Sequence, residues 1–84
     1  MKIAKEINDH TGIASGLNDI AAVYGNLQEY DKVTRYLEDA LIINNELKNK
    51  RAVAINFTNL GVISQRLKKY DTALIYFQKA YKLF

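Results

Sequence analysis

The fold is decided by residues 54–83, which read AINFTNLGVISQRLKKYDTALIYFQKAYKL. A shift of forty residues places this stretch, without a gap, on residues 14–43, which read ASGLNDIAAVYGNLQEYDKVTRYLEDALII. Across the 44 overlapping positions, eight residues are identical. The identical pairs are Ile3/Ile43, Glu6/Glu46, Ala14/Ala54, Leu27/Leu67, Tyr30/Tyr70, Asp31/Asp71, Tyr36/Tyr76 and Ala40/Ala80. Self-similarity at a fixed period is typical of repeat proteins, so we expect copies of one structural unit.

The apolar residues of each copy recur three and four positions apart, which places them on one face of a helix. In the first helix of each copy they are Ile13, Leu17, Ile20, Tyr24 and Leu27, then Val53, Phe57, Leu60, Ser64 and Leu67, with Ser64 in place of the tyrosine. Each copy is therefore predicted to be a pair of helices. The predicted helices span residues 11–26, 30–48, 50–66 and 70–84, with turns at 27–29 and 67–69. Asp31 and Asp71 fall in the first turns of the second helices, where a carboxylate offsets the helix dipole.

This pattern predicts an all-α fold, a solenoid of antiparallel helix pairs, because neither helix of such a pair buries its apolar face alone. We expect about two repeats, at residues 11–50 and 51–84. Residues 1–9 align with residues 41–49, the end of a second helix, so residues 1–10 are predicted to form a partial helix. Gly12 is expected to end that helix.

Composition limits the class of protein. A chain of 84 residues forms one domain at most. It contains no cysteine, which excludes disulfides, thiolate zinc sites and cysteine nucleophiles. Residues 1–10 are too polar for a secretory signal, and the apolar runs are too short to span a bilayer. We therefore expect a cytoplasmic protein with no membrane association.

The net charge of +3 raises the question of nucleic-acid binding. The basic residues cluster at 48–51 and at 66–69. If one helix joins the clusters, they lie about 20 Å apart at its two ends. Two basic helix ends are more typical of solvated turns than of a phosphate track, so we do not expect nucleic acid as a partner.

The repeat resembles the tetratricopeptide-repeat family, whose pattern places a large apolar residue before Leu-Gly and later an alanine four positions before a phenylalanine. Phe57, Leu60-Gly61, Ala73 and Phe77 match it, and Ala80 matches a small residue used where helices approach closely. The period of forty exceeds the usual one of about 34 residues, and the proline after the second helix is missing. The chain therefore resembles the longer-repeat branch, as found in bacterial sensor and regulator proteins.

The resemblance implies a protein- or peptide-binding scaffold whose first helices line a concave groove. The alternative, that these positions are ordinary exposed surface, stays open. Ala22 and Thr58 stand where chaperone-binding members carry polar or basic residues, so that specificity is not expected. The candidate groove residues are Ser15, Asn18, Ala22, Asn26, Ile55, Thr58, Asn59, Val62 and Arg66.

Catalytic chemistry has little support in the sequence. His10, the single histidine, lies at a predicted turn without the partners that a general base needs. Neither serine lies in a nucleophile motif, and Glu38-Asp39 point apart on a helix. We expect no enzyme activity, no metal, no cofactor and no small-molecule substrate. The tyrosines at 30, 36, 70 and 76 recur at the repeat period, so packing explains them better than base stacking does.

Two further functions stay open. One is a regulatory sensor segment of a larger signalling protein, in which a bound peptide shifts the packing of neighbouring repeats. The other is a structural self-assembly module, either a homo-oligomer or part of a longer repeat array, because the last helix carries apolar residues that a following helix pair would cover. The residues predicted for self-association are Leu74, Phe77, Tyr81 and Phe84.

Overall fold

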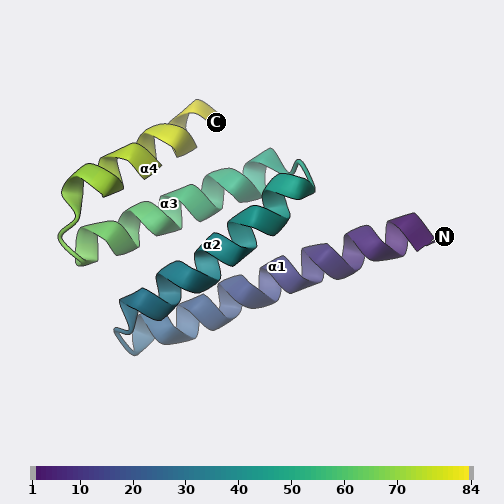
Figure 1. Cartoon of the computed structure of the whole chain (residues 1–84), viewed down its shortest axis with the longest axis horizontal. Coiled ribbons are helices and arrows are strands. Elements are labelled where there is room, and N and C mark those ends of the chain that lie inside the picture. The colour runs from purple at the N-terminus through teal and green to yellow at the C-terminus, as the bar shows by residue number, and fades with distance from the viewer. Residues whose placement is uncertain (1, 84) are drawn as a thin grey trace.

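Residues 2–83 form four helices (Figure 1). The computed structural model describes the backbone of residues 2–83 and the side chains of residues 10–83. The helices are α1 (Lys2–Asn26), α2 (Tyr30–Glu46), α3 (Lys50–Arg66) and α4 (Tyr70–Leu83). Within residues 2–83, everything outside the three short turns is helical, so the predicted all-α fold is confirmed.

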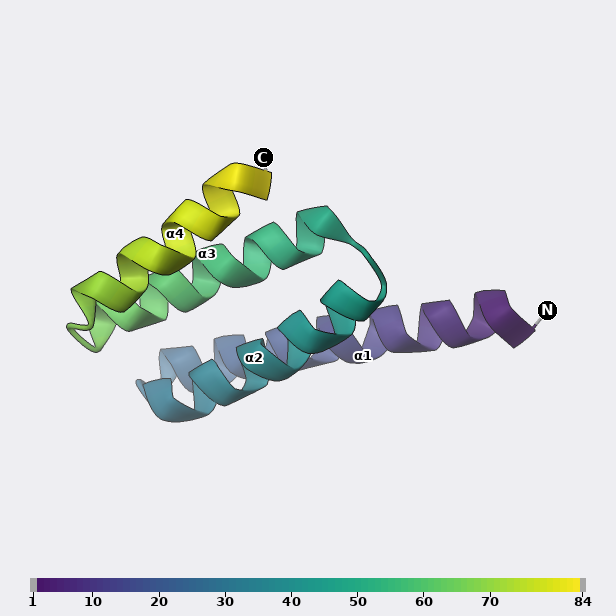
Figure 2. The same ribbon diagram turned by 45° about the horizontal axis from the view of Figure 1, so that its top comes forward.

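Consecutive helices are antiparallel and form two hairpins, α1–α2 and α3–α4, that lie side by side (Figures 1 and 2). Among the described residues, only helices that are neighbours in the chain bring their backbones close together: α1 and α2, α2 and α3, and α3 and α4. The α2–α3 junction therefore joins the hairpins, which is the stacking that a helical solenoid requires.

The three turns share one backbone geometry. The middle residue of each has a positive φ: 60° at Gln28, 55° at Lys48 and 62° at Lys68. The N–H of the next residue donates to a carbonyl oxygen five residues earlier, a bond typical of helix C-terminal caps. These bonds are Glu29 N–H to Tyr24 O (3.0 Å), Asn49 N–H to Asn44 O (3.1 Å) and Lys69 N–H to Ser64 O (2.8 Å). Because the turns recur every twenty residues, each helix with its turn forms half of the forty-residue period.

The structure confirms the turns at residues 27–29 and 67–69 and corrects the link between α2 and α3. We expected the second helix to extend to residue 48 and the third helix to begin at residue 50, with no three-residue turn between them. Instead α2 ends at Glu46, and residues 47–49 form the same three-residue turn as the other two links. Asn49 then caps α3, because its side-chain oxygen accepts a hydrogen bond from the Ala52 N–H (3.2 Å).

The predicted break near the start of the chain is wrong. Helix α1 runs without interruption from Lys2 to Asn26, so His10 lies at no turn, Gly12 ends no helix, and residues 2–10 form no separate helix. Glycine in a helix costs about 1 kcal/mol relative to alanine, but continuing the helix keeps the backbone hydrogen-bonded. As a result α1 projects beyond the end of α2 (Figure 1). The division into repeats at 11–50 and 51–84 stays a prediction.

The core lies between the hairpins, with Leu60 of α3 at its centre. Leu60 is buried, as predicted, and packs with residues from α1, α2 and α3: Ala21, Val33, Leu37 and Ile63. The equivalent apolar residues of α1 were also expected to be buried, but Ile13, Ile20 and Leu27 are exposed. The reason is that the backbone of α3 lies close to two helices, α2 and α4, whereas that of α1 lies close to α2 alone.

The periodic tyrosines mostly pack, as predicted. Tyr36 stacks on Tyr24 with ring centroids 5.6 Å apart, and Tyr76 stacks on Phe57 at 6.1 Å. Tyr30 is half-buried against the core. Its equivalent in the next copy, Tyr70, is exposed, which corrects the prediction for that residue. Tyr30 shares a surface hollow with Leu67 of the following hairpin, and no described helix follows α4 to do the same for Tyr70.

Gly61 is required by the close approach of Phe77. A Cβ atom at position 61 would lie 2.6–2.9 Å from three atoms of the Phe77 ring, closer than carbon atoms can pack. Forty residues earlier, the equivalent pair in the core is Ala21 and Leu37. The two copies therefore fill one space differently, with glycine and phenylalanine in one and alanine and leucine in the other.

We predict that Gly61→Ala lowers the free energy of unfolding by about 1 kcal/mol, because overpacking costs about 1–3 kcal/mol and alanine's helix propensity offsets about 1 kcal/mol. In a Phe77→Leu background, which recreates the first copy's pair, the same substitution should become neutral or stabilising. Urea denaturation of the four chains measures both effects. An equal effect of Gly61→Ala in both backgrounds would show that the Phe77 ring is not the obstacle.

Candidate functional site

A cleft lies between α1 and α3, with α2 at its base. Its volume is about 200 Å³. The lining residues are Asn18, Ala21, Ala22 and Gly25 of α1, Val33 and Leu37 of α2, and Asn59, Val62 and Ile63 of α3. We refer to this feature as the α1–α3 cleft.

The α1–α3 cleft is apolar at its base and carries one amide on each wall. Seven of its nine lining residues are apolar, and three of those on α1 are alanine or glycine, which leave space open. The two polar residues are Asn18 on α1 and Asn59 on α3. An apolar hollow with few polar groups is the usual form of a binding site in proteins.

A chain of three asparagine side chains runs from α2 through α3 to α1. Asn44 Nδ2 donates to Asn56 Oδ1 at 2.7 Å, and Asn56 Nδ2 donates to Asn18 Oδ1 at 3.0 Å. Asn56 is fully buried and Asn44 nearly so, whereas Asn18 is half-buried at the cleft. Because a buried amide without partners is costly, this asparagine chain fixes how the three helices sit together.

Four of the nine predicted groove residues line the α1–α3 cleft: Asn18, Ala22, Asn59 and Val62. The side-chain carbonyl oxygen of Asn18 already accepts a hydrogen bond from the Asn56 side chain. Thr58 is half-buried, and its hydroxyl donates to the Ala54 carbonyl one turn earlier (2.9 Å). The remaining four residues are exposed but lie outside the cleft lining: Ser15, Asn26, Ile55 and Arg66.

Sequence reasoning missed Asn44 and Asn56, although a signal was present. Asn56 lies three residues after Val53 and four before Leu60, so it continues the buried stripe of α3. Asn44 likewise lies four residues after the buried Ala40. An asparagine at helical spacing on an apolar face predicts a buried amide, which requires polar partners on neighbouring helices.

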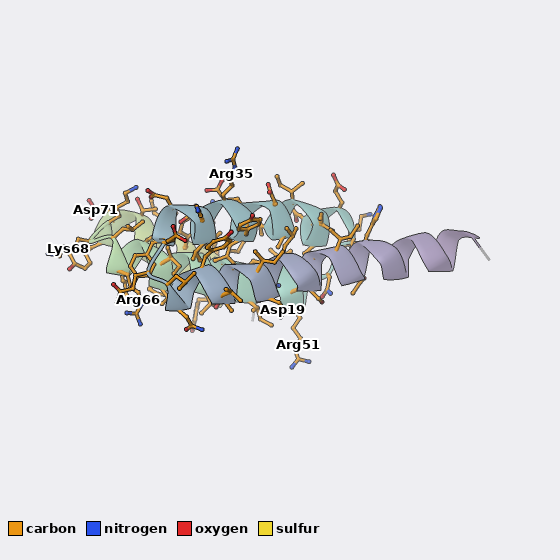
Figure 3. All side chains as sticks on the ribbon, turned by 90° about the horizontal axis from the view of Figure 1, so that it is seen from below. Asp19, Arg35, Arg51, Arg66, Lys68 and Asp71 are labelled. Atoms are coloured by element: carbon orange, nitrogen blue, oxygen red, sulfur yellow. The ribbon has the colours of Figure 1, made fainter. Side chains whose placement is uncertain are left out.

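Three charged residues of α1 and α3 point to one side of the molecule. Asp19, Arg51 and Arg66 project from this side in Figure 3, while Arg35 of α2 projects from the opposite side. Among residues 10–83, the one ion pair joins Lys32 Nζ to Glu29 Oε1 at 3.3 Å, so Arg51 and Arg66 are not neutralised within the described part of the chain. The two arginines lie near the two ends of α3, the helix that supplies one wall of the α1–α3 cleft.

The described side chains contain no group of three or more His, Asp or Glu residues arranged to hold a metal ion. The single histidine, His10, is exposed. No helix within residues 2–83 combines the length and hydropathy needed to cross a bilayer.

Comparison with known proteins gives one family. The family model described as "Tetratricopeptide repeat" matches residues 3–84, nearly the whole chain. Searches of curated proteins and of solved structures gave no significant match. The family match agrees with the observed hairpin stacking and with the small residues that allow its helices to approach.

We predict that Asn56→Leu lowers the free energy of unfolding by about 1–3 kcal/mol, because it leaves the buried Asn44 amide without a partner. Replacing both residues with leucine should restore at least about 1 kcal/mol relative to Asn56→Leu, since no buried amide is then left unpaired. Urea denaturation measures the difference. If the losses from Asn44→Leu and Asn56→Leu simply add in the double variant, the two side chains are not coupled as described.

Proposed function

Because the chain belongs to the tetratricopeptide-repeat family, whose members are generally protein-interaction scaffolds and typically non-catalytic, we propose that the α1–α3 cleft binds an extended segment of a partner protein. The main support for this proposal is the position of the cleft between the first helices of the two hairpins. These helices present the adjoining face to solvent (Figure 3).

The size of the cleft favours a peptide side chain over a free small molecule. Sites for small molecules commonly enclose about 300–1,000 Å³. The α1–α3 cleft has about 200 Å³ and is open to solvent, so it suits one large apolar side chain of a longer ligand. Val33, Leu37 and Val62 would contact that side chain.

The polar groups around the cleft suit the backbone and charge of a peptide. The Asn59 amide on one wall offers a donor and an acceptor, which matches the alternating groups of an extended backbone. Arg51 and Arg66 lie on the same side of the molecule and are not neutralised within the described residues. We therefore propose a peptide with an apolar anchor residue and acidic residues beside it.

The second candidate function, a regulatory sensor segment, draws support from Asn18. This residue lines the cleft and also ends the asparagine chain that reaches the α2–α3 junction. A ligand that takes over the Asn18 oxygen would release one bond of Asn56, and so change the packing between hairpins. Under this function, peptide binding alters amide exchange at the α2–α3 junction; under a plain scaffold function, it does not.

We predict that Ala22→Phe weakens peptide binding at least tenfold, because the new ring fills the cleft. Ala22 is exposed, so the free energy of unfolding should change by no more than about 0.5 kcal/mol. Peptides selected from a random library on the 84-residue chain supply the ligands, and isothermal titration calorimetry measures their affinities. Arg66→Glu should weaken the acidic peptides among them and remove most of the salt dependence of their affinity.

Arg35→Glu is the matched control for charge reversal, because Arg35 points to the opposite side of the molecule (Figure 3). It should leave affinity unchanged. Selected peptides that bind the Ala22→Phe chain with undiminished affinity would place the binding site outside the α1–α3 cleft and refute the proposal.

A further inference from the structure

Helix α1 carries an uncovered apolar stripe whose equivalents on α3 are buried. The α1 stripe consists of Ile13, Ile20, Val23 and Leu27. Ile13 is 52% exposed, Ile20 42% and Val23 58%. Forty residues later, Val53, Leu60 and Ile63 are 6%, 1% and 8% exposed, and Leu67 is half-buried. The sequence therefore keeps the same apolar positions in both helices, although only one set is covered in the described structure.

The difference between the two stripes comes from helix α2. It packs on α3, and Val33 and Leu37 share a core with Leu60 and Ile63. Among the described residues, the one helix whose backbone lies close to α1 is its own hairpin partner, and the exposure of the α1 stripe shows that no helix covers it. By comparison with the α2–α3 junction, the α1 stripe is suited to pack against a helix whose apolar face resembles that of α2.

Helix α4 carries an uncovered counterpart of that α2 face. Leu37 of α2 is buried, and Leu41 packs against the core beside it. The equivalent positions in α4 are Phe77 and Tyr81, and Tyr81 is 83% exposed. Leu74, on the same face of α4, is also exposed. Of the residues predicted for self-association, Leu74 and Tyr81 are thus available, Phe77 is half-buried against Gly61, and Phe84 lies outside the described residues.

We propose that the chain associates head to tail with a second copy of itself: the α4 face of one chain covers the α1 stripe of the next, as α2 covers α3 within the chain. The proposed contact repeats the α2–α3 junction, because the same chain carries an equivalent of the α3 surface on α1 and an equivalent of the α2 surface on α4. This contact is heterologous, since two different surfaces meet, and each added copy leaves a free α1 stripe and a free α4 face. It does not involve the α1–α3 cleft, so it stands independently of peptide binding.

The pairing of sequence positions supports the same contact. Within the chain, Asn44 of α2 meets Asn56 of α3. The α1 position equivalent to Asn56 is Gly16. A Cβ atom at Gly16 would have no neighbour within 4 Å, so α1 leaves open space where α3 carries a buried amide. A helix that covers the α1 stripe would thus meet no amide side chain at that position.

Two charge substitutions, one on each surface, test the proposal. Sedimentation velocity of the wild-type chain from about 1 to 100 μM should show a mass that keeps rising with concentration and does not stop at a dimer. Ile20→Glu on α1 and Tyr81→Glu on α4 should each weaken association at least tenfold. When the two variants are mixed, the intact α4 face of one and the intact α1 stripe of the other should form a 1:1 dimer.

Ile42→Glu is the matched control, because Ile42 is an exposed isoleucine on α2 that belongs to neither surface. It should associate like the wild type, and circular dichroism of all chains should show unchanged helix content. A wild-type monomer at every concentration would overturn the proposal. So would an Ile20→Glu chain that still dimerises alone, since that result indicates a two-fold α4–α4 contact, or a mixture of the two variants that stays monomeric.

Discussion

The fold depends on how the Asn56 amide of α3 is hydrogen-bonded to both helices of the other hairpin. Asn44 of α2 donates to it, and it donates to Asn18 of α1. Helices α1 and α3 make no direct backbone approach among the described residues, so this hydrogen-bonded link, with the Leu60 core beside it, sets their separation. The α1–α3 cleft occupies that separation. The same buried amide therefore stabilises the junction and determines the width of the candidate site.

The two copies of the repeat share a backbone and differ in matched pairs of side chains. Where Ala21 lies in a core with Leu37, the second copy places Gly61 under Phe77. The aromatic stacks also differ, because Tyr36 uses Tyr24 whereas the equivalent Tyr76 uses Phe57. In the first case both helices of the hairpin change, whereas in the second the tyrosine is kept and its partner moves within the first helix of the copy. The interior is close-packed, so such substitutions are tolerated when the total volume is conserved.

Much of the fold was predictable from the sequence, because the spacing of apolar residues is a local signal. The bounds of α3 and the turn at residues 67–69 were predicted correctly on that basis. What could not be predicted depends on neighbouring helices. Ile20 and Leu60 have the same spacing, yet only Leu60 has a helix packed over it. The continuity of α1 through Gly12 also contradicted the repeat alignment. For the site, four of the predicted groove residues line the α1–α3 cleft, but the partner of Asn18 lies 38 positions away and required the tertiary structure.

The central claim is that Asn56 is buried and hydrogen-bonded between the hairpins, and side-chain amide exchange measured by NMR tests it most directly. Buried, hydrogen-bonded amide protons exchange only when the structure opens. The account predicts that the Asn44 and Asn56 side-chain amides exchange with water at least about tenfold more slowly than those of the exposed Asn26 and Asn45. Exchange of Asn56 at the same rate as Asn26 and Asn45 would contradict the account, since an amide in free contact with water could not set the spacing of α1 and α3.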